Sequence, residues 1–493
     1  MNTLMRSRAV FAFVLLMALA SCSTMQSHNN LANQMQVAQQ TGGIPGALKA
    51  LESSATTDKQ RAELLFNLER GELLRLNKQY SESTQAFLLA DKKVNEWEEA
   101  AKTNPERLLA TLGAATISER IKIYEGQDYE KVWLTTRLAL NRVAANDLEN
   151  ARVDIKRTHE REAVIAEFRS KDTAKAEEEA KKKGAQNTGK EIGGYPVETL
   201  NDPEVLALKN GYQNALSHYL AGFLYEILNE SGLAAPGYRK AIELKPNTAV
   251  LENGLRGLDD RTSFTHKRRQ RMTDVLFVVE AGDAPARNSQ AFTVPIPTKD
   301  GIRTVSISYP VVRPSTDQPL AKLTAGDKEF KLEKVVDVNV MARRALKDEM
   351  PALVLRNLTR AIVKWQLQKQ LEKSAGVWGS VIGSVASIIT EQADDRIWRR
   401  LPGRVYLARG YLPEGEHIID IDGKNLRVNV KFGGQYSLVP LRLNGSEIIV
   451  GDIGSFGDLN VSPTKEPEPV PVPVKPKKPP VKSTPNVPAA PAK

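Results

Sequence analysis

The feature that most constrains the fold is a set of small, aromatic and proline residues at helical spacing between residues 222 and 246. Its members are Gly222, Tyr225, Ala234, Tyr238, Ala241 and Pro246. Small residues let paired helices approach closely, and aromatic rings fill the gaps between pairs. Proline cannot continue a helix, so Pro246 marks an end. The segment therefore predicts a helix pair that needs a neighbouring pair to bury its remaining face.

Three segments fit the 34-residue tetratricopeptide (TPR) pattern, and the one described above fits it best. In the other two, the residues in register are Gly71, Tyr80, Ala90, Ala139 and Ala151. Helical periodicity holds from about residue 47 to residue 261, so we predict a TPR-like all-α domain over residues 47–262. A generic helical bundle is the alternative.

The pattern changes near Thr262, where short stretches predict β-strands, and two of them, 291–297 and 304–309, alternate with a period of two. These stretches are 274–280, 291–297, 304–309, 404–408, 416–420, 426–430, 435–439 and 447–450. Two helices are expected among them, at 338–373 with a boundary or kink at Pro351, and at 376–389. We therefore predict an α+β multidomain chain. Its C-terminal mixed domain, residues 263–460, has short antiparallel strands and a small β-sandwich-like part.

The N-terminus has the layout of a secretory signal peptide over residues 1–21. Two arginines precede an apolar run, and the run ends in Leu-Ala-Ser-Cys at residues 19–22. This ending resembles a bacterial lipobox, which implies cleavage between Ser21 and Cys22 and lipid attachment to Cys22. Ser23 follows the cysteine, which favours the outer membrane over the inner one. An ordinary signal peptide with a chance cysteine is the alternative. Residues 22–46 are polar and predict a tether.

Residues 461–493 predict a disordered tail, because 463–493 holds 11 prolines. Its lysines Lys475, Lys477, Lys478 and Lys482 are candidates for contact with a polyanion such as peptidoglycan. The formal net charge is +10. Nucleic acid is not an expected partner, because an exported lipoprotein rarely meets it. No apolar segment after the signal peptide is long enough to predict a transmembrane helix.

Catalytic and metal-binding motifs are not recognisable. The five histidines are His28, His159, His218, His266 and His417, and none pairs with another at metal-ligand spacing. His159-Glu160 begins like a zinc motif, but Ala163 stands at the second ligand position. The acid pairs 259–260 and 394–395 are expected to be solvated faces or caps. We predict no enzyme activity, no metal and no cofactor.

Two further stretches each allow two interpretations. The basic cluster at 266–271 is either a solvated helix end or a contact for anionic lipid, and the first is preferred. The apolar stretch 376–389 has small residues at four-residue spacing. It is either a buried helix or a membrane-inserting segment, and the buried helix is preferred.

The third repeat motif, residues 275–285 and residues 393–402 together resemble a family of uncharacterised TPR-containing proteobacterial outer-membrane lipoproteins. The resemblance implies a helical repeat half followed by an α+β half. Genes of that family tend to lie beside genes for outer-membrane lipoproteins that activate penicillin-binding proteins. The resemblance therefore implies a link to that pathway.

From these features we expect a periplasm-facing outer-membrane lipoprotein that acts as a non-enzymatic scaffold in cell-wall synthesis regulation or envelope maintenance. The repeats would hold a protein partner in their groove, the lipid would bind the membrane, and the tail would touch peptidoglycan. A structural accessory of an export, pilus or adhesion assembly is the alternative. An enzyme acting on cell-wall glycans is the third, least favoured reading.

Overall fold

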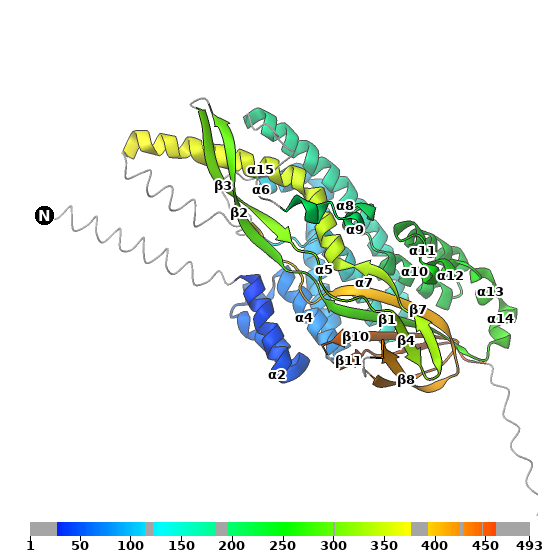
Figure 1. The fold of residues 1–493 in the computed structure, drawn as a ribbon. Coiled ribbons are helices and arrows are strands. Elements are labelled where there is room, and N and C mark those ends of the chain that lie inside the picture. The colour runs from blue at the N-terminus through cyan, green and yellow to red at the C-terminus, as the bar shows by residue number, and fades with distance from the viewer. Residues whose placement is uncertain are drawn as a thin grey trace, which may run out of the picture. The chain divides into compact units, whose positions relative to one another are not determined.

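A computed structural model describes residues 27–113, 122–183, 196–298, 301–375, 393–423, 427–445 and 447–459 (Figure 1). Helices come first along the chain and strands dominate after residue 272, so the predicted α+β fold class is confirmed. Within the described residues, no helix has both the length and the apolar character to cross a membrane.

Three helix pairs correspond to the three predicted repeats. They are α4 (Leu64–Leu76) with α5 (Tyr80–Thr103), α7 (Asp128–Ala144) with α8 (Leu148–Lys183), and α10 (Ala215–Ile227) with α11 (Ser231–Leu244). The remaining described helices are α2 (His28–Ser54), α3 (Asp58–Arg61), α6 (Pro105–Gly113), η2 (Val197–Leu200), α9 (Pro203–Ala207), α12 (Ala249–Leu255), α13 (Leu258–Thr262), α14 (Phe264–Arg269) and α15 (Val338–Ala375).

All three pairs turn in the same way. Lys78, Asn146 and Asn229 each have a left-handed backbone, with φ of 60°, 57° and 64°. The next residue then donates its N–H to a carbonyl five positions earlier, at 2.9 Å, 2.8 Å and 2.8 Å. This bond closes a Schellman turn, and asparagine tolerates the left-handed backbone better than most residues.

Close helix approach within the pairs depends on glycine. A Cβ on Gly71 would lie 2.5 Å from the Phe87 ring, and a Cβ on Gly222 would lie 2.8 Å from the Tyr238 ring. Both rings are completely buried. The small and aromatic residues therefore lie against each other as their spacing predicts.

The predicted tether is wrong from residue 28 onward, because α2 begins there. Met35 and Ala47 are completely buried in a cluster with Leu73 of α4. The polar composition of this stretch hides the apolar positions that make the contact. Gly43, with φ of 63°, and Pro45 mark a kink inside α2 rather than an end of structure.

The strands form a central sheet, an outer sheet and a hairpin. The central sheet has the order β11-β10-β1-β7-β6, with β12 also paired to β10. Its strands are β1 (Thr273–Asp283), β6 (Glu333–Asp337), β7 (Pro402–Leu412), β10 (Tyr436–Asn444), β11 (Glu447–Val450) and β12 (Gly454–Phe456). The outer sheet has the order β5-β4-β8-β9, from β4 (Lys322–Ala325), β5 (Lys328–Lys331), β8 (Gly415–Ile421) and β9 (Arg427–Phe432). The hairpin is β2 (Arg287–Thr298) with β3 (Gly301–Val312).

Strand pairing differs from the prediction in two ways. β1 pairs antiparallel with β7 but parallel with β10, so the sheet is mixed rather than antiparallel. β4, β5, β6 and β12, each three to five residues long, were not expected, although the equally short β11 was. Such short strands carry little alternation.

The central sheet lies between the outer sheet and the helices. Along β1, Val275, Phe277 and Val279 belong to the core shared with the outer sheet. Leu276 and Val278 belong to the core shared with the helices. Successive side chains of a strand point to opposite faces, so one strand can serve two cores.

The predicted boundary at 262/263 separates helix-rich from strand-containing sequence but does not divide the packing. The chain up to Leu459 forms one compact unit, and one core cluster joins α4, α7 and α10 to β1, β7 and β10. Helix α15 extends through Pro351, which is not its end. The predicted helix at 376–389, the signal peptide and the tail lie outside the described residues.

Candidate functional site

The first helices of the three pairs, α4, α7 and α10, direct ionisable side chains at the central sheet. Arg137 of α7 makes an ion pair with Glu280 of β1, and Arg75 of α4 lies 3.0 Å from the same carboxylate. Glu72 of α4 pairs with Arg75 at 2.8 Å and with Arg137 at 3.1 Å. All four side chains are at least nine-tenths buried. Burial alone would raise the pKa of Glu280, but Arg137 and Arg75 hold it well below its usual range.

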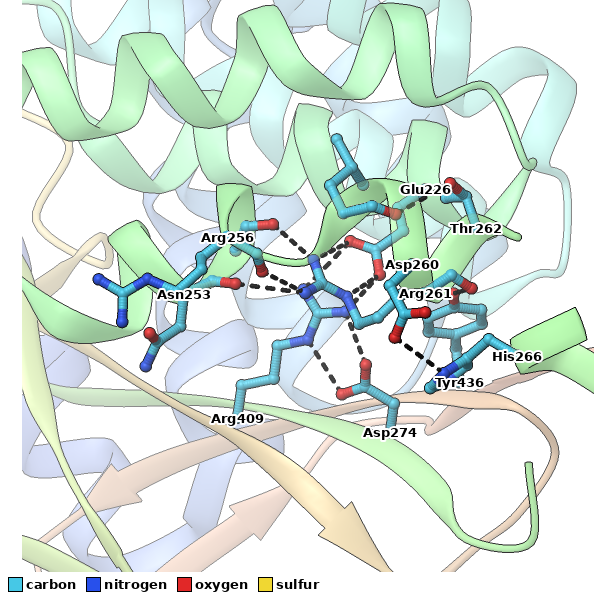
Figure 2. Close-up of polar contacts among 12 residues, drawn as sticks. Glu226, Asn253, Arg256, Asp260, Arg261, Thr262, His266, Asp274, Arg409 and Tyr436 are labelled. Carbon is cyan, nitrogen blue, oxygen red and sulfur yellow. Dashed lines mark hydrogen bonds and ion pairs between the residues drawn. The ribbon is translucent and has the colours of Figure 1, made fainter. Parts of the chain in front are cut away.

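A second buried network joins α10 to β7 and β1 (Figure 2). Arg409 of β7 donates to Asp274 of β1 at 2.7 Å and 3.0 Å, and to Glu226 of α10 at 2.7 Å. Arg261 also donates to Glu226, at 2.7 Å and 3.0 Å, and Tyr238 donates to it at 2.6 Å. Burial alone would raise the pKa of Glu226, but Arg409 and Arg261 lower it to about 2.

These two networks place β1, β7 and β10 against the side of the repeats formed by their first helices. Phe223 of α10 adds an edge-to-face contact with Tyr436 of β10, at 6.1 Å between ring centroids. The repeat surface that we expected to hold a partner is, on this side, covered by the chain's own sheet.

A cleft of about 540 Å³ opens beside the second network. Arg409, Arg261 and Asp274 line it, and α12, α13, α14, β5, β6 and β7 supply further parts of the wall. Figure 2 shows His266 and Asp260 at this edge, with 3.3 Å between Nδ1 and the carboxylate. The guanidinium groups are saturated by carboxylates and backbone carbonyls. The cleft therefore offers shape and hydrogen bonds rather than an unpaired charge.

Two histidines that are distant in the sequence lie side by side in the structure. Nε2 of His159 on α8 lies 3.0 Å from Nδ1 of His218 on α10, and the rings stack. His218 also contacts Glu162 at 3.1 Å. The two histidines are 59 residues apart, so no local spacing could reveal the pair. In the described part of the chain, no cluster of three or more His, Cys, Asp or Glu side chains could hold a metal ion.

A segment between α15 and β7, residues 393–401, is held inside the fold, and we call it the strap. Glu69 of α4 accepts the N–H groups of Arg399 and Arg400, at 2.7 Å and 3.1 Å. Glu130 of α7 accepts the N–H of Trp398 at 2.6 Å. Burial raises the pKa of Glu130 to about 7, although the hydrogen bonds that the carboxylate accepts lower it. The strap is part of the segment that carries the resemblance to the lipoprotein family.

The acid pairs lie in different surroundings. Asp259 and Asp260 are exposed in the first turn of α13, as expected, whereas Asp395 is buried, so the expectation of a solvated face is wrong for that residue. Asp260 faces His266 at the cleft, whereas Asp394 pairs with Arg396 at 2.8 Å. Asp395 accepts a hydrogen bond from Ser27 at 2.8 Å.

The basic cluster lies at the C-terminal end of α14 and just after it. This position suits the helix-end interpretation, because cations favour the negative end of a helix. Phe264, at the start of the same helix, is 78% exposed.

The remaining repeat residues are structural. Ala90, Ala139, Ala151, Ala234 and Ala241 are buried. The Tyr80 hydroxyl accepts the N–H of Asp452 at 2.7 Å, Tyr225 lies 5.8 Å from the Arg152 guanidinium, and Pro246 follows α11. Ser21, Cys22 and the four tail lysines lie outside the described residues.

Comparison with protein-family models, with curated proteins and with solved structures finds no match. The resemblance to the lipoprotein family therefore stays a prediction.

Proposed function

We propose that this chain is an outer-membrane lipoprotein that faces the periplasm and acts as a non-enzymatic scaffold for other envelope proteins. The lipid on Cys22 would hold it at the membrane. Lys475, Lys477, Lys478 and Lys482 would let the tail touch peptidoglycan, whose acidic groups complement them. A tail that contacts peptidoglycan favours one specific scaffold role, the regulation of cell-wall synthesis.

The observation that carries the proposal is the closed network around Glu226. Its carboxylate accepts from Arg409, Arg261 and Tyr238 at once. With a pKa of about 2 it stays ionised at neutral pH, so it neither gives nor takes a proton there. The densest group of ionisable side chains around the cleft thus supports rigidity rather than reaction chemistry.

Partner contact is assigned to the cleft rather than to the covered side of the repeats. Asn253 and Lys331 are exposed on its two walls, on α12 and β5. Tyr411 adds a ring that can pack against a partner side chain. A cleft of about 540 Å³ accommodates a few residues of an extended loop or a chain end.

Site-specific photocrosslinking in cells tests this proposal. A photoreactive amino acid would replace Asn253 or Lys331, and Leu89 of α5, which is 54% exposed, would be the matched control. We expect a discrete adduct of defined mass from the cleft positions and none from Leu89. Adducts that are equal at all three positions would contradict a specific partner site.

A second measurement separates the scaffold from an enzyme. The purified mature protein would be incubated with peptidoglycan, and soluble muropeptides would be measured by chromatography. We expect no release above a buffer control. Release that increases with protein concentration would contradict the non-enzymatic role.

A further inference from the structure

The first described residues are fixed to two distant parts of the chain. Ser27 donates its hydroxyl to Asp395 of the strap at 2.8 Å. Asn29 donates its side-chain N–H to the carbonyl of Arg287, the first residue of β2, at 3.0 Å. The chain is therefore held to the folded body from Ser27 onward.

Covalent reach then limits how far the body can lie from a membrane anchored through Cys22. A fully extended chain spans at most about 3.3–3.6 Å per residue. Ser27 follows Cys22 by five positions, so any membrane that holds the lipid lies within about 18 Å of Ser27. The tether expected for residues 22–46 would have allowed roughly 80 Å.

The strap joins Ser27 to an exposed apolar side chain. Arg396 donates to the carbonyl of Lys122 at 2.9 Å, and its guanidinium lies 5.1 Å from the Tyr124 ring. Ile123, between those two residues, is 88% exposed. No other large apolar side chain in the described residues is as exposed. One exposed apolar residue is ordinary by itself, but this one is linked by the strap to the residue that limits the membrane distance.

We infer that the surface made by Ser27, Lys122, Ile123, Tyr124 and Arg396, here called the anchor face, lies against the phospholipid membrane. Ile123 enters the interface between headgroups and acyl chains, and Tyr124 lies beside it. Asp394 neutralises much of the charge of Arg396, at 2.8 Å. Apolar contact and the short covalent link, rather than charge, therefore hold this face against the membrane. The inference rests on the proposed lipidation of Cys22.

Fluorescence quenching by labelled lipids tests the anchor face. Cys22 is the only cysteine, and lipidation uses its thiol, so one new cysteine gives one labelling site. The lipidated full chain would carry Ile123→Cys with a polarity-sensitive label, in vesicles of phosphatidylethanolamine and phosphatidylglycerol. Controls are Phe264→Cys, beside the basic cluster on α14, and Ile418→Cys on β8; the native side chains are 78% and 55% exposed.

We expect spin-labelled lipid to quench the label at position 123 at least about threefold more than the label at 264 or 418. A probe that enters the interface by ~5–10 Å contacts the quencher. If the mass shows that the protein is acylated, equal quenching, or stronger quenching at 264, would overturn the anchor face alone. A mass that shows unmodified Cys22 would instead overturn the proposed lipoprotein itself.

Discussion

Glu280 of β1 and Arg137 of α7 form an ion pair with 4% and 0% of their side chains exposed. The pair lies where the central sheet meets the repeats, and Arg75 and Glu72 complete it. Two charges removed from water are stable only when each keeps its partners. The sheet and the repeats therefore depend on each other at this point.

Removing one member of this network should be costly. Glu280→Ala leaves Arg137 and Arg75 buried without one of their carboxylates, so we expect the free energy of unfolding to fall by about 3–5 kcal/mol. Urea titration measures it. Glu52→Ala is the control, because the Arg70–Glu52 pair is 31% and 48% exposed, and surface pairs contribute about 0–1 kcal/mol. Equal losses for the two variants would contradict a structural role for the buried network.

Glycine at the helix crossings should be irreplaceable. Gly71→Ala puts a methyl group 2.5 Å from the ring of Phe87, which is completely buried. We expect a loss of about 1–3 kcal/mol from overpacking. In Gly232→Ala of α11 the new Cβ meets nothing within 4 Å, so the helix should gain up to about 1 kcal/mol. Thermal melts of both variants test this, and a neutral Gly71→Ala would show that the pair is loosely packed.

Glu226 should stabilise the protein most above its unfolded-state pKa. Its pKa falls from 4.5 to about 2 on folding. Its contribution is therefore complete above pH 4.5 and is lost as the pH falls from 4.5 through about 2. The linkage relation gives a contribution on the order of 3 kcal/mol. The stability difference between wild type and Glu226→Gln should shrink from pH 7 to pH 3, and a difference that stays constant would contradict the ion-pair assignment.

The contribution of Glu130 to stability should depend on pH in the opposite direction. Its pKa rises from 4.5 to about 7 on folding, so the folded state holds the proton more tightly. The stabilisation is complete below pH 4.5 and is lost as the pH rises through about 7. We expect Glu130→Gln to gain stability relative to wild type between pH 4.5 and pH 8, on the order of 3 kcal/mol. Parallel stability curves for the two proteins would contradict the raised pKa.

Local signals in the sequence predicted the elements well. Gly222 and Tyr238 are 16 positions apart in the sequence, and their contact follows from helix-pair geometry. The apolar run within 274–280 predicted β1, because a strand that is buried on both faces has continuous apolar residues. Such patterns fix helices, strands and their immediate partners.

Contacts between distant segments could not be predicted in the same way. β1 pairs with β10 in parallel, with Phe277 opposite Val439, and no turn links the two strands. The burial of Glu280 is also unexpected, since a charged residue in a strand usually faces solvent. The two parts of the chain were thus predicted as separate domains, although charged side chains and one core join them.

Two-probe unfolding tests the central claim that the sheet covers the first-helix side of the repeats. Intrinsic fluorescence reports on the five tryptophans of the chain, of which Trp97, Trp133 and Trp398 are buried on the helical side. A label at Ile418→Cys on β8, in a chain with Cys22→Ser, reports on the outer sheet. We predict coincident urea transitions that Glu280→Ala shifts together. Two separate transitions, with only one moved by that variant, would show that the repeats and the sheet are independent domains and would contradict the account.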